Sequence, residues 1–254
     1  MIHAWLNVRS TVSVVLVEDS SSASAKSSIL RMIIRGIKQI LLGVYEITPD
    51  AGSAFFLRAD YLSLVTEDRL LPYGYGRLDV DLEDLSGLKE GDTGFFNSEE
   101  TEDLYKASLL YAVEKAAMSY LNRAEHSRSS LYSKLIKKGL EKEHILTVLD
   151  YLEEKGILSD RRFASAWLRS RSIDHNEGRS RLSGELTARG LDRGVIKEAL
   201  DEYFLEHDEE ELCRKALKKL LRVKKDGEKI KAALVRQGFS FKMIQKIFSE
   251  TNIL

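Results

Sequence analysis

From about Glu99 onward, apolar side chains recur mainly at spacings of three and four residues, which is the period of one face of an α-helix. The first such run includes Leu104, Ala107, Leu110, Tyr111 and Ala117. No proline follows Pro72 in the sequence, and an interior proline would cost a helix about 3 kcal/mol. The pattern therefore predicts a mostly helical segment from near Glu99 to the end of the chain.

A different pattern precedes this segment. From Ile37 the chain has short apolar runs bounded by turn residues, one from Val44 to Ile47 and another from Ala54 to Leu57. Between the two runs, Pro49, Asp50 and Gly52 supply the residue types that form tight turns. The sequence therefore predicts a β-hairpin within a small β-rich domain.

Composition sets the boundaries of that domain. The stretch from Ser20 to Ser28 is dominated by serine and cannot bury much apolar area, so it is typical of a linker. We expect residues 1–31 to be a flexible extension, residues 32–100 to form the β-rich domain, and residues 101–123 to form a connecting helix. The prediction for the rest of the chain depends on an internal repeat.

The helical segment repeats itself three times. A leucine, three further residues, a glycine and then leucine or phenylalanine recur with the glycines 51 and 48 residues apart. The copies are Leu135, Gly139 and Leu140; Leu186, Gly190 and Leu191; and Leu234, Gly238 and Phe239. This arrangement predicts a helix with one apolar face, ended by a glycine in the left-handed conformation and followed by a second amphipathic helix.

A third helix is predicted to follow the pair in the first two copies, starting near Asp160 and near Glu209. We interpret residues 124–174 as the first repeat, residues 175–226 as the second, and residues 227–254 as a truncated third repeat of two helices. Each unit alone has a small core, so stacked neighbours would complete it. The predicted fold class is mainly α, with tandem three-helix repeats in an elongated curved array after a small β-containing N-terminal domain.

The residues of these repeats resemble the RecX family of recombinase regulators. The likeness rests on Ser127, Arg128, Ser129 and Leu131; on Gly156 to Asp160 with Phe163, Ala164, Arg169 and Arg171; on Gly178 to Leu182 with Leu186 and Gly190; and on Leu234, Gly238 and Phe239. It covers roughly half the chain, and the order of the three units is more specific than any single element.

The resemblance implies a regulator that lodges in the helical groove of a RecA recombinase filament. Such a protein would block filament extension, ATP hydrolysis and strand exchange, and would thereby moderate recombinational DNA repair and the SOS response. Any contact with single-stranded DNA would be made through the filament. We expect residues 124–254 to carry this activity.

Charge bears on the alternative, a helical-repeat protein that binds DNA directly. The formal net charge is -1 and the sequence pI is about 6.6, whereas a dedicated DNA-binding domain usually has a pI above about 9. Residues 1–100 hold 9 Lys and Arg against 15 Asp and Glu, and the remainder holds 30 against 25. A surplus of five positive charges argues against strong DNA binding by the protein alone, although it leaves that alternative open.

Two basic clusters are the candidate binding surface for the recombinase or for nucleic acid. The first contains Arg161, Arg162, Arg169, Arg171, Arg179 and Arg181; the second contains Lys215, Lys218, Lys219, Arg222, Lys224 and Lys225. Arg128 and Arg189 are further candidates for the same role. A solvated helix face explains any one of these residues, whereas an arginine-rich set suits recognition of carboxylate or phosphate. If the basic clusters contact an acidic filament groove or its DNA, replacing Arg169, Arg171, Arg179 and Arg181 together by Glu should abolish inhibition and leave the helical content intact.

The sequence lacks the residue patterns of metal-binding, nucleotide-hydrolysing and membrane-spanning proteins. The five histidines show no metal-ligand spacing with one another or with Cys213, the single cysteine. No glycine-rich loop precedes Lys and Ser or Thr, so a nucleotide-hydrolysing enzyme is not predicted. The apolar run from Val12 to Val17 is too short to span a membrane. We expect a cytoplasmic protein that is not an enzyme and has no metal, cofactor or membrane partner.

Overall fold

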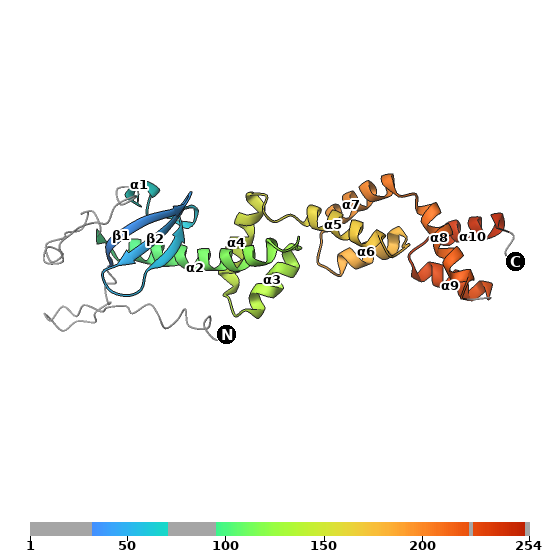
Figure 1. Ribbon diagram of the computed structural model, residues 1–254, viewed down its shortest axis with the longest axis horizontal. Helices are drawn as coiled ribbons and strands as arrows, with labels where there is room; N and C mark the ends of the chain where they lie inside the picture. Colours follow the sequence, from blue (N-terminus) through green and yellow to red (C-terminus); the bar gives the residue numbers. More distant parts are fainter. Residues whose placement is uncertain (1–31, 71–94, 224–225, 252–254) are drawn as a thin grey trace. The chain divides into compact units, whose positions relative to one another are not determined.

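The computed structural model describes residues 32–70, 95–223 and 226–251 and shows two compact units (Figure 1). Clustering of the chain places the boundary between Ala116 and Ala117, inside one long helix. The predicted extension over residues 1–31, together with Pro72, Lys224 and Lys225, lies outside the described residues.

The first unit contains a four-stranded antiparallel sheet in the order β3-β2-β1-β4. Its strands are β1 (Met32–Leu41), β2 (Val44–Pro49), β3 (Phe55–Arg58) and β4 (Phe95–Phe96). The predicted hairpin is confirmed as β2 and β3, with Ile47 paired to Phe55. The hydrophobic pattern did not predict the first part of β1, because a register shift between Ile34 and Gly36 interrupts the alternation of buried residues.

Two short helices, η1 (Ala59–Tyr61) and α1 (Glu67–Leu70), precede the long helix α2 (Ser98–Leu121). The start of α2 is one residue from its predicted position. The Asn97 side chain accepts a hydrogen bond from the Glu100 amide, and the Glu100 carboxylate accepts one from the Asn97 amide. This reciprocal capping satisfies backbone donors that a helix start otherwise leaves without partners.

The prediction of residues 101–123 as a connecting helix needs correction, because α2 also completes the fold of the first unit. Its buried Asp103 accepts hydrogen bonds from the backbone amides of Ser63, Leu64 and Val65. Burial tends to raise the pKa of this carboxyl, but hydrogen bonds from the Ser63 hydroxyl and from these amides outweigh burial and lower it. The Glu114 carboxylate accepts hydrogen bonds from Nε and Nη2 of Arg58 at 2.7 and 2.6 Å.

The second unit is built from helices of nine to fourteen residues after the end of α2. These are α3 (Arg128–Lys137), α4 (Lys142–Glu154), α5 (Asp160–Ser172), α6 (Arg179–Thr187), α7 (Arg193–Glu206), α8 (Glu209–Leu221), α9 (Gly227–Arg236) and α10 (Phe241–Glu250). The repeated pairs are α3 with α4, α6 with α7, and α9 with α10.

Glycines end the first helix of each pair. Gly139, Gly190 and Gly238 have φ angles of 79°, 77° and 92°, in the left-handed region that favours glycine. Two residues later, Asp192 and Ser240 open α7 and α10 by accepting backbone hydrogen bonds with their side chains. The aligned sequence pattern therefore corresponds to a helix–turn–helix unit in each copy.

The structure changes how these pairs are grouped into three-helix units. Ala164 and Leu168 of α5 lie in one core with residues of α6 and α7, and α5 packs directly on α7. In the same way α8 packs on α9 and α10. The sequence analysis instead assigned α5 to the unit before it, because an amphipathic period reveals a buried stripe but not which neighbour covers it. The last three helices thus form a three-helix group rather than a truncated pair.

Successive pairs meet at the glycine turns. The Ser127 hydroxyl, at the start of α3, donates to the Arg189 carbonyl at 3.0 Å, next to Gly190. The Gly178 amide, at the start of α6, donates to the Gln237 carbonyl at 2.9 Å, next to Gly238. A Cβ atom on Gly190 would lie 2.5 Å from the Cβ of Ser129, so this turn has no room for a side chain.

This crowding predicts that Gly190→Ala destabilises the protein more than Gly139→Ala. Both substitutions place alanine in the left-handed region, at a cost of about 1–2 kcal/mol. Only Gly190 would collide with another helix, because nothing lies within 4 Å of a Cβ on Gly139. Urea unfolding of the two variants measures the difference. Equal losses of stability would show that the contact between Ser129 and the turn is absent in solution.

Candidate interaction surface

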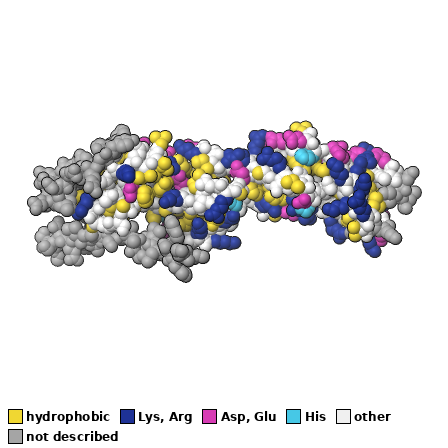
Figure 2. Space-filling model, viewed as in Figure 1, with side chains coloured by type: hydrophobic (Ala, Val, Ile, Leu, Met, Phe, Trp, Pro, Cys, Tyr) yellow, Lys and Arg dark blue, Asp and Glu magenta, His cyan; other side chains and the backbone are white. Residues whose placement is uncertain are grey.

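Most of the basic residues proposed from the sequence already have a carboxylate partner within the protein. The pairs are Arg128 with Asp150 and Glu153, Arg162 with Glu125, Arg171 and Arg181 with Glu177, Arg179 with Asp201, Arg181 and Arg189 with Glu185, and Lys215 with Glu211. In the face drawn in Figure 2, Lys and Arg side chains alternate with Asp and Glu. The first predicted cluster is thus largely an ion-pair network, whereas among the described residues of the second cluster only Lys215 has such a partner.

Arg128 and Arg179 occupy the same repeat position, eleven residues before the glycine, and form equivalent bridges. Arg128 reaches Asp150 of α4 at 2.6 Å, and Arg179 reaches Asp201 of α7 at 2.6 Å. Their backbone amides make a second equivalent contact, donating to Asp160 at 2.7 Å and to Glu209 at 2.8 Å. In the first two pairs, these arginines therefore hold the first helix to the helices that follow.

Glu177 is the most enclosed carboxylate of this network, with 8% of its surface exposed. Arg171 binds it through two nitrogens at 2.7 and 3.0 Å, and Arg181 binds it at 3.0 Å. Burial alone would raise the pKa of Glu177, but the hydrogen bonds and charges of the two arginines outweigh burial and lower it from 4.5. Arg171 and Arg189 also lie over the Trp167 ring, 5.7 and 4.6 Å from its centroid.

A smaller set of the proposed residues is exposed and has no ion pair in the part of the chain that the structure describes. We call it the open basic set: Arg169, Lys218, Lys219 and Arg222. Arg169 lies in the last turn of α5, Lys218 and Lys219 lie in the last turn of α8, and Arg222 follows as its C-cap. Positive charge at a helix C-terminus is favourable, so these residues also suit the fold.

The sequence analysis missed two further cations of this kind, Arg193 and Lys197 on α7. Both are exposed, and neither has an ion pair among the described residues. Their spacing of four residues on one helix was visible in the sequence and would have placed them on one face.

The described residues contain neither a metal-binding cluster nor an activated cysteine. No group of three or more His, Cys, Asp or Glu there could hold a metal ion. Burial raises the pKa of the Cys213 thiol to about 11, so it stays protonated at neutral pH and is not a thiolate nucleophile. Over the same residues, no helix is both long enough and apolar enough to cross a membrane.

The fold and this surface define a class: a tandem helical-repeat protein that presents charged helix ends. Comparison with family models identifies two of the repeats more closely. The model for the first three-helix domain of RecX matches residues 115–152, and the model for its second three-helix domain matches residues 159–200. The second match starts at the N-cap of α5, in agreement with the packing of α5 on α7.

Individual relatives extend the match. Regulatory protein RecX of Treponema pallidum (strain Nichols) is 38% identical over 136 residues, which cover 54% of this chain and 83% of the relative. Its counterpart in Pseudomonas fluorescens (strain SBW25) is 36% identical over 143 residues, covering 55% of this chain and 92% of the relative. This chain belongs to the RecX family.

Two solved structures have a similar fold. A crystal structure of regulatory protein RecX gives a TM-score of 0.62 at 20% identity, covering 86% of this chain and 99% of that one. The crystal structure of RecX from Lactobacillus salivarius gives 0.52 at 22% identity, covering 58% and 99%.

The ion pairs predict that two arginines of the same helix, Arg171 and Arg169, contribute unequally to the stability of the fold. Arg171→Glu should lower the free energy of unfolding by about 2 kcal/mol or more, because it leaves the enclosed Glu177 facing a like charge. Arg169→Glu should change it by less than about 0.5 kcal/mol, because Arg169 is exposed and has no ion pair among the described residues. Thermal melts of the two variants test this, and equal melting temperatures would contradict it.

This contrast also corrects an expectation from the sequence. Reversing the charge of Arg169, Arg171, Arg179 and Arg181 together was expected to spare the helices. Three of the four make ion pairs that tie helices or their ends together, so the combined change should weaken the fold. Loss of binding in that variant would not identify a contact surface.

The lowered pKa of Glu177 predicts that the stability of the fold depends on pH. Because its pKa is lowered in the folded state, its stabilising effect is complete above the ordinary pKa of 4.5 and is lost as the pH falls through the folded-state pKa. Glu177→Gln should therefore be less stable than the parent at pH 7, and the difference should shrink as the pH falls below 4.5. Urea unfolding from pH 7 to pH 3 measures this. A difference that stays constant would show that the carboxylate charge does not stabilise the fold.

Proposed function

We propose that this protein binds RecA recombinase filaments and inhibits their extension, ATP hydrolysis and strand exchange. It would thereby moderate recombinational DNA repair and the SOS response, acting in the cytoplasm without catalysis of its own. Membership of the RecX family carries this proposal, because the relatives are regulatory proteins and this chain covers 83% and 92% of two of them. Residues 124–254 are proposed to hold the activity, because they contain the repeats and because the family models match residues 115–152 and 159–200, the first two helix pairs.

The open basic set is the proposed contact surface within those repeats. A cation that already has a carboxylate at 2.6 to 2.7 Å gains less from contact with an acidic protein surface, because its own carboxylate repels that surface. Lys218, Lys219 and Arg222 have no such carboxylate among the described residues, so their charge is available. Complementary charge of this kind speeds association and selects the orientation of binding.

We predict that Lys218→Glu with Lys219→Glu weakens inhibition of RecA-dependent ATP hydrolysis about tenfold, which corresponds to 1.4 kcal/mol. Two reversed charges oppose association, whereas exposed side chains contribute little to folding. The readout is the concentration of protein that halves ATP hydrolysis by RecA on single-stranded DNA. Circular dichroism should show unchanged helical content.

The matched control is Lys137→Glu with Lys142→Glu, which reverses two exposed cations beside the Gly139 turn. It should inhibit like the parent. If both double variants inhibit equally well, the end of α8 is a solvated face. If the parent protein does not inhibit RecA at all, the proposed function itself is wrong.

Direct DNA binding is tested with the same proteins. Binding of single-stranded DNA is measured across a salt series with and without RecA. Tight binding without RecA that weakens steeply with salt would favour the DNA-binding alternative, because such binding depends on neutralised phosphates.

A further inference from the structure

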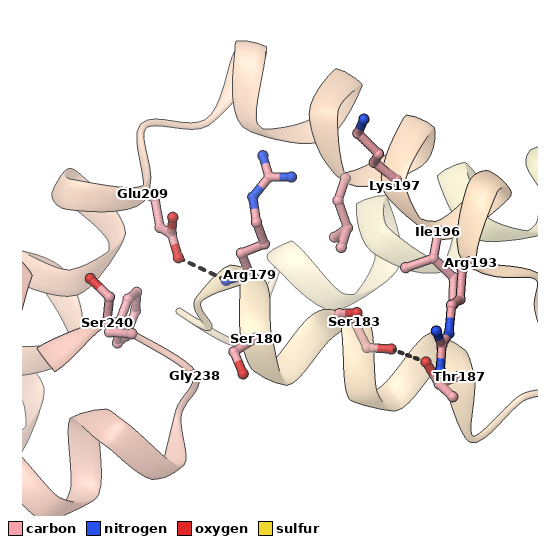
Figure 3. Close-up of a pocket in the computed structure, with 12 residues that line it drawn as sticks. Arg179, Ser180, Ser183, Thr187, Arg193, Ile196, Lys197, Glu209, Gly238 and Ser240 are labelled. Carbon is pink, nitrogen blue, oxygen red and sulfur yellow. Dashed lines mark hydrogen bonds between the residues drawn. The ribbon is translucent and has the colours of Figure 1, made fainter.

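A groove of about 730 Å³ lies within the second unit, outside the open basic set. Figure 3 shows its lining side chains, which come from α6, from α7, from the first residue of α8 and from the turn between α9 and α10. Arg193 and Lys197 of α7 contribute positive charge, and Ser180 and Ser183 of α6 contribute hydroxyls. The largely buried Phe239 also lines the groove.

The groove carries two positive charges without a carboxylate partner. Its third cation, Arg179, binds Asp201 at 2.6 Å, and its single acid, Glu209, accepts the Arg179 amide at 2.8 Å. Arg193 and Lys197 form no ion pair with any residue that the structure describes. The electrostatic character of the groove therefore favours an anionic ligand.

Hydrogen-bonding groups line the wall next to these charges. The Thr187 hydroxyl donates to the Ser183 carbonyl at 2.9 Å, as Figure 3 shows. The hydroxyls of Ser180 and Ser183, one helical turn apart on α6, have no hydrogen-bond partner among the described residues. Both can donate to a carboxylate or to a backbone carbonyl of a ligand.

Comparison of the three copies shows that helix packing does not require this pair of cations. The positions equivalent to Arg193 and Lys197, counted from the glycine, hold Lys142 and Leu146 in the first copy. In the third copy they hold Phe241 and Gln245. Only the second copy combines two cations at these positions.

We propose that the groove binds a short acidic segment of a partner protein, with carboxylates against Arg193 and Lys197. The inference rests on the proposed function only in that the partner is a protein. From Ser180 to Thr187, α6 rises about 10 Å, the length of about three residues of extended chain. The groove thus matches a few residues that carry two acidic side chains.

Nucleic acid fits these observations less well. Proteins that bind single strands without sequence preference combine several phosphate contacts with aromatic rings on which bases stack. Phe239 is the aromatic residue of the lining and only 3% of its surface is exposed, so it offers no stacking platform. Two cations suffice for two carboxylates but would hold a phosphate backbone weakly.

The test uses the full chain labelled with ¹⁵N and a hexaglutamate peptide at millimolar concentration. Saturable chemical-shift changes at the amides of Ser180, Ser183, Arg193 and Lys197 are expected. In Arg193→Glu with Lys197→Glu, the affinity for the peptide should fall at least about tenfold, because two attractive contacts become repulsive. The control variant Lys137→Glu with Lys142→Glu should bind the peptide like the parent.

Three outcomes would overturn this assignment. The first is the absence of saturable shifts at the groove amides of the well-folded parent. The second is unchanged peptide affinity in the groove variant. The third is equal or stronger binding of hexathymidylate at the same amides, which would make the groove a nucleic-acid site. Because this measurement contains no recombinase, peptide binding without inhibition of RecA would refute the proposed function alone, and inhibition without peptide binding would refute the groove alone.

Discussion

The helical unit depends on the close contact between the first helix of one pair and the glycine turn of the next. The start of α3 lies so close to Gly190 that a Cβ atom on this glycine would overlap Ser129. A Cβ atom on Gly238 would lie 2.3 Å from the backbone nitrogen of Arg181 in α6. Hydrogen bonds from the Gly178 and Ser180 amides to backbone carbonyls of the Gly238 turn join the start of α6 to that turn. A glycine is therefore needed twice over at these turns, for its positive φ and for its lack of a side chain. Repeats with small individual cores gain stability from such interfaces.

Arginine contributes to the same architecture. Arg128 and Arg179 bridge equivalent helices, and Arg171 with Arg181 neutralises the enclosed Glu177. A planar guanidinium suits this use because its donors are arranged to meet carboxylates in fixed geometry. The consequence for function is that a count of basic residues overstates the surface available to a partner. Open charges that could meet a partner include those at the ends of α5 and α8 and along the start of α7.

These open charges divide into two kinds of surface. Lys218, Lys219 and Arg222 sit at the C-terminal end of α8, where exposed cations can guide association with a large acidic or nucleoprotein surface. Arg193 and Lys197 instead line a groove with free hydroxyls, which suits a short and specific ligand. A regulator with both could separate initial attraction from recognition of one segment. The two double variants test these roles separately.

Much of the local structure of this protein could be predicted from the sequence alone. The spacing of Leu135 and Gly139 and its two repetitions predicted the helix–turn–helix pairs, because helix period and the left-handed glycine are local properties. The hairpin of β2 and β3 and the start of α2 were local in the same sense. The family resemblance was also evident from residues in order along the chain.

Tertiary structure decided what depends on residues far apart in sequence. Whether α5 packs on α4 or α7 is a choice between apolar surfaces, and the packing of Leu168 with the α6 and α7 core settles it. Which arginines are open depends on carboxylates far along the chain, 37 residues away in the case of Arg162 and Glu125. The groove around Arg193 exists only because the turn after α9 meets α6. Local periodicity carries no information about such distant partners, so only the folded chain could reveal them.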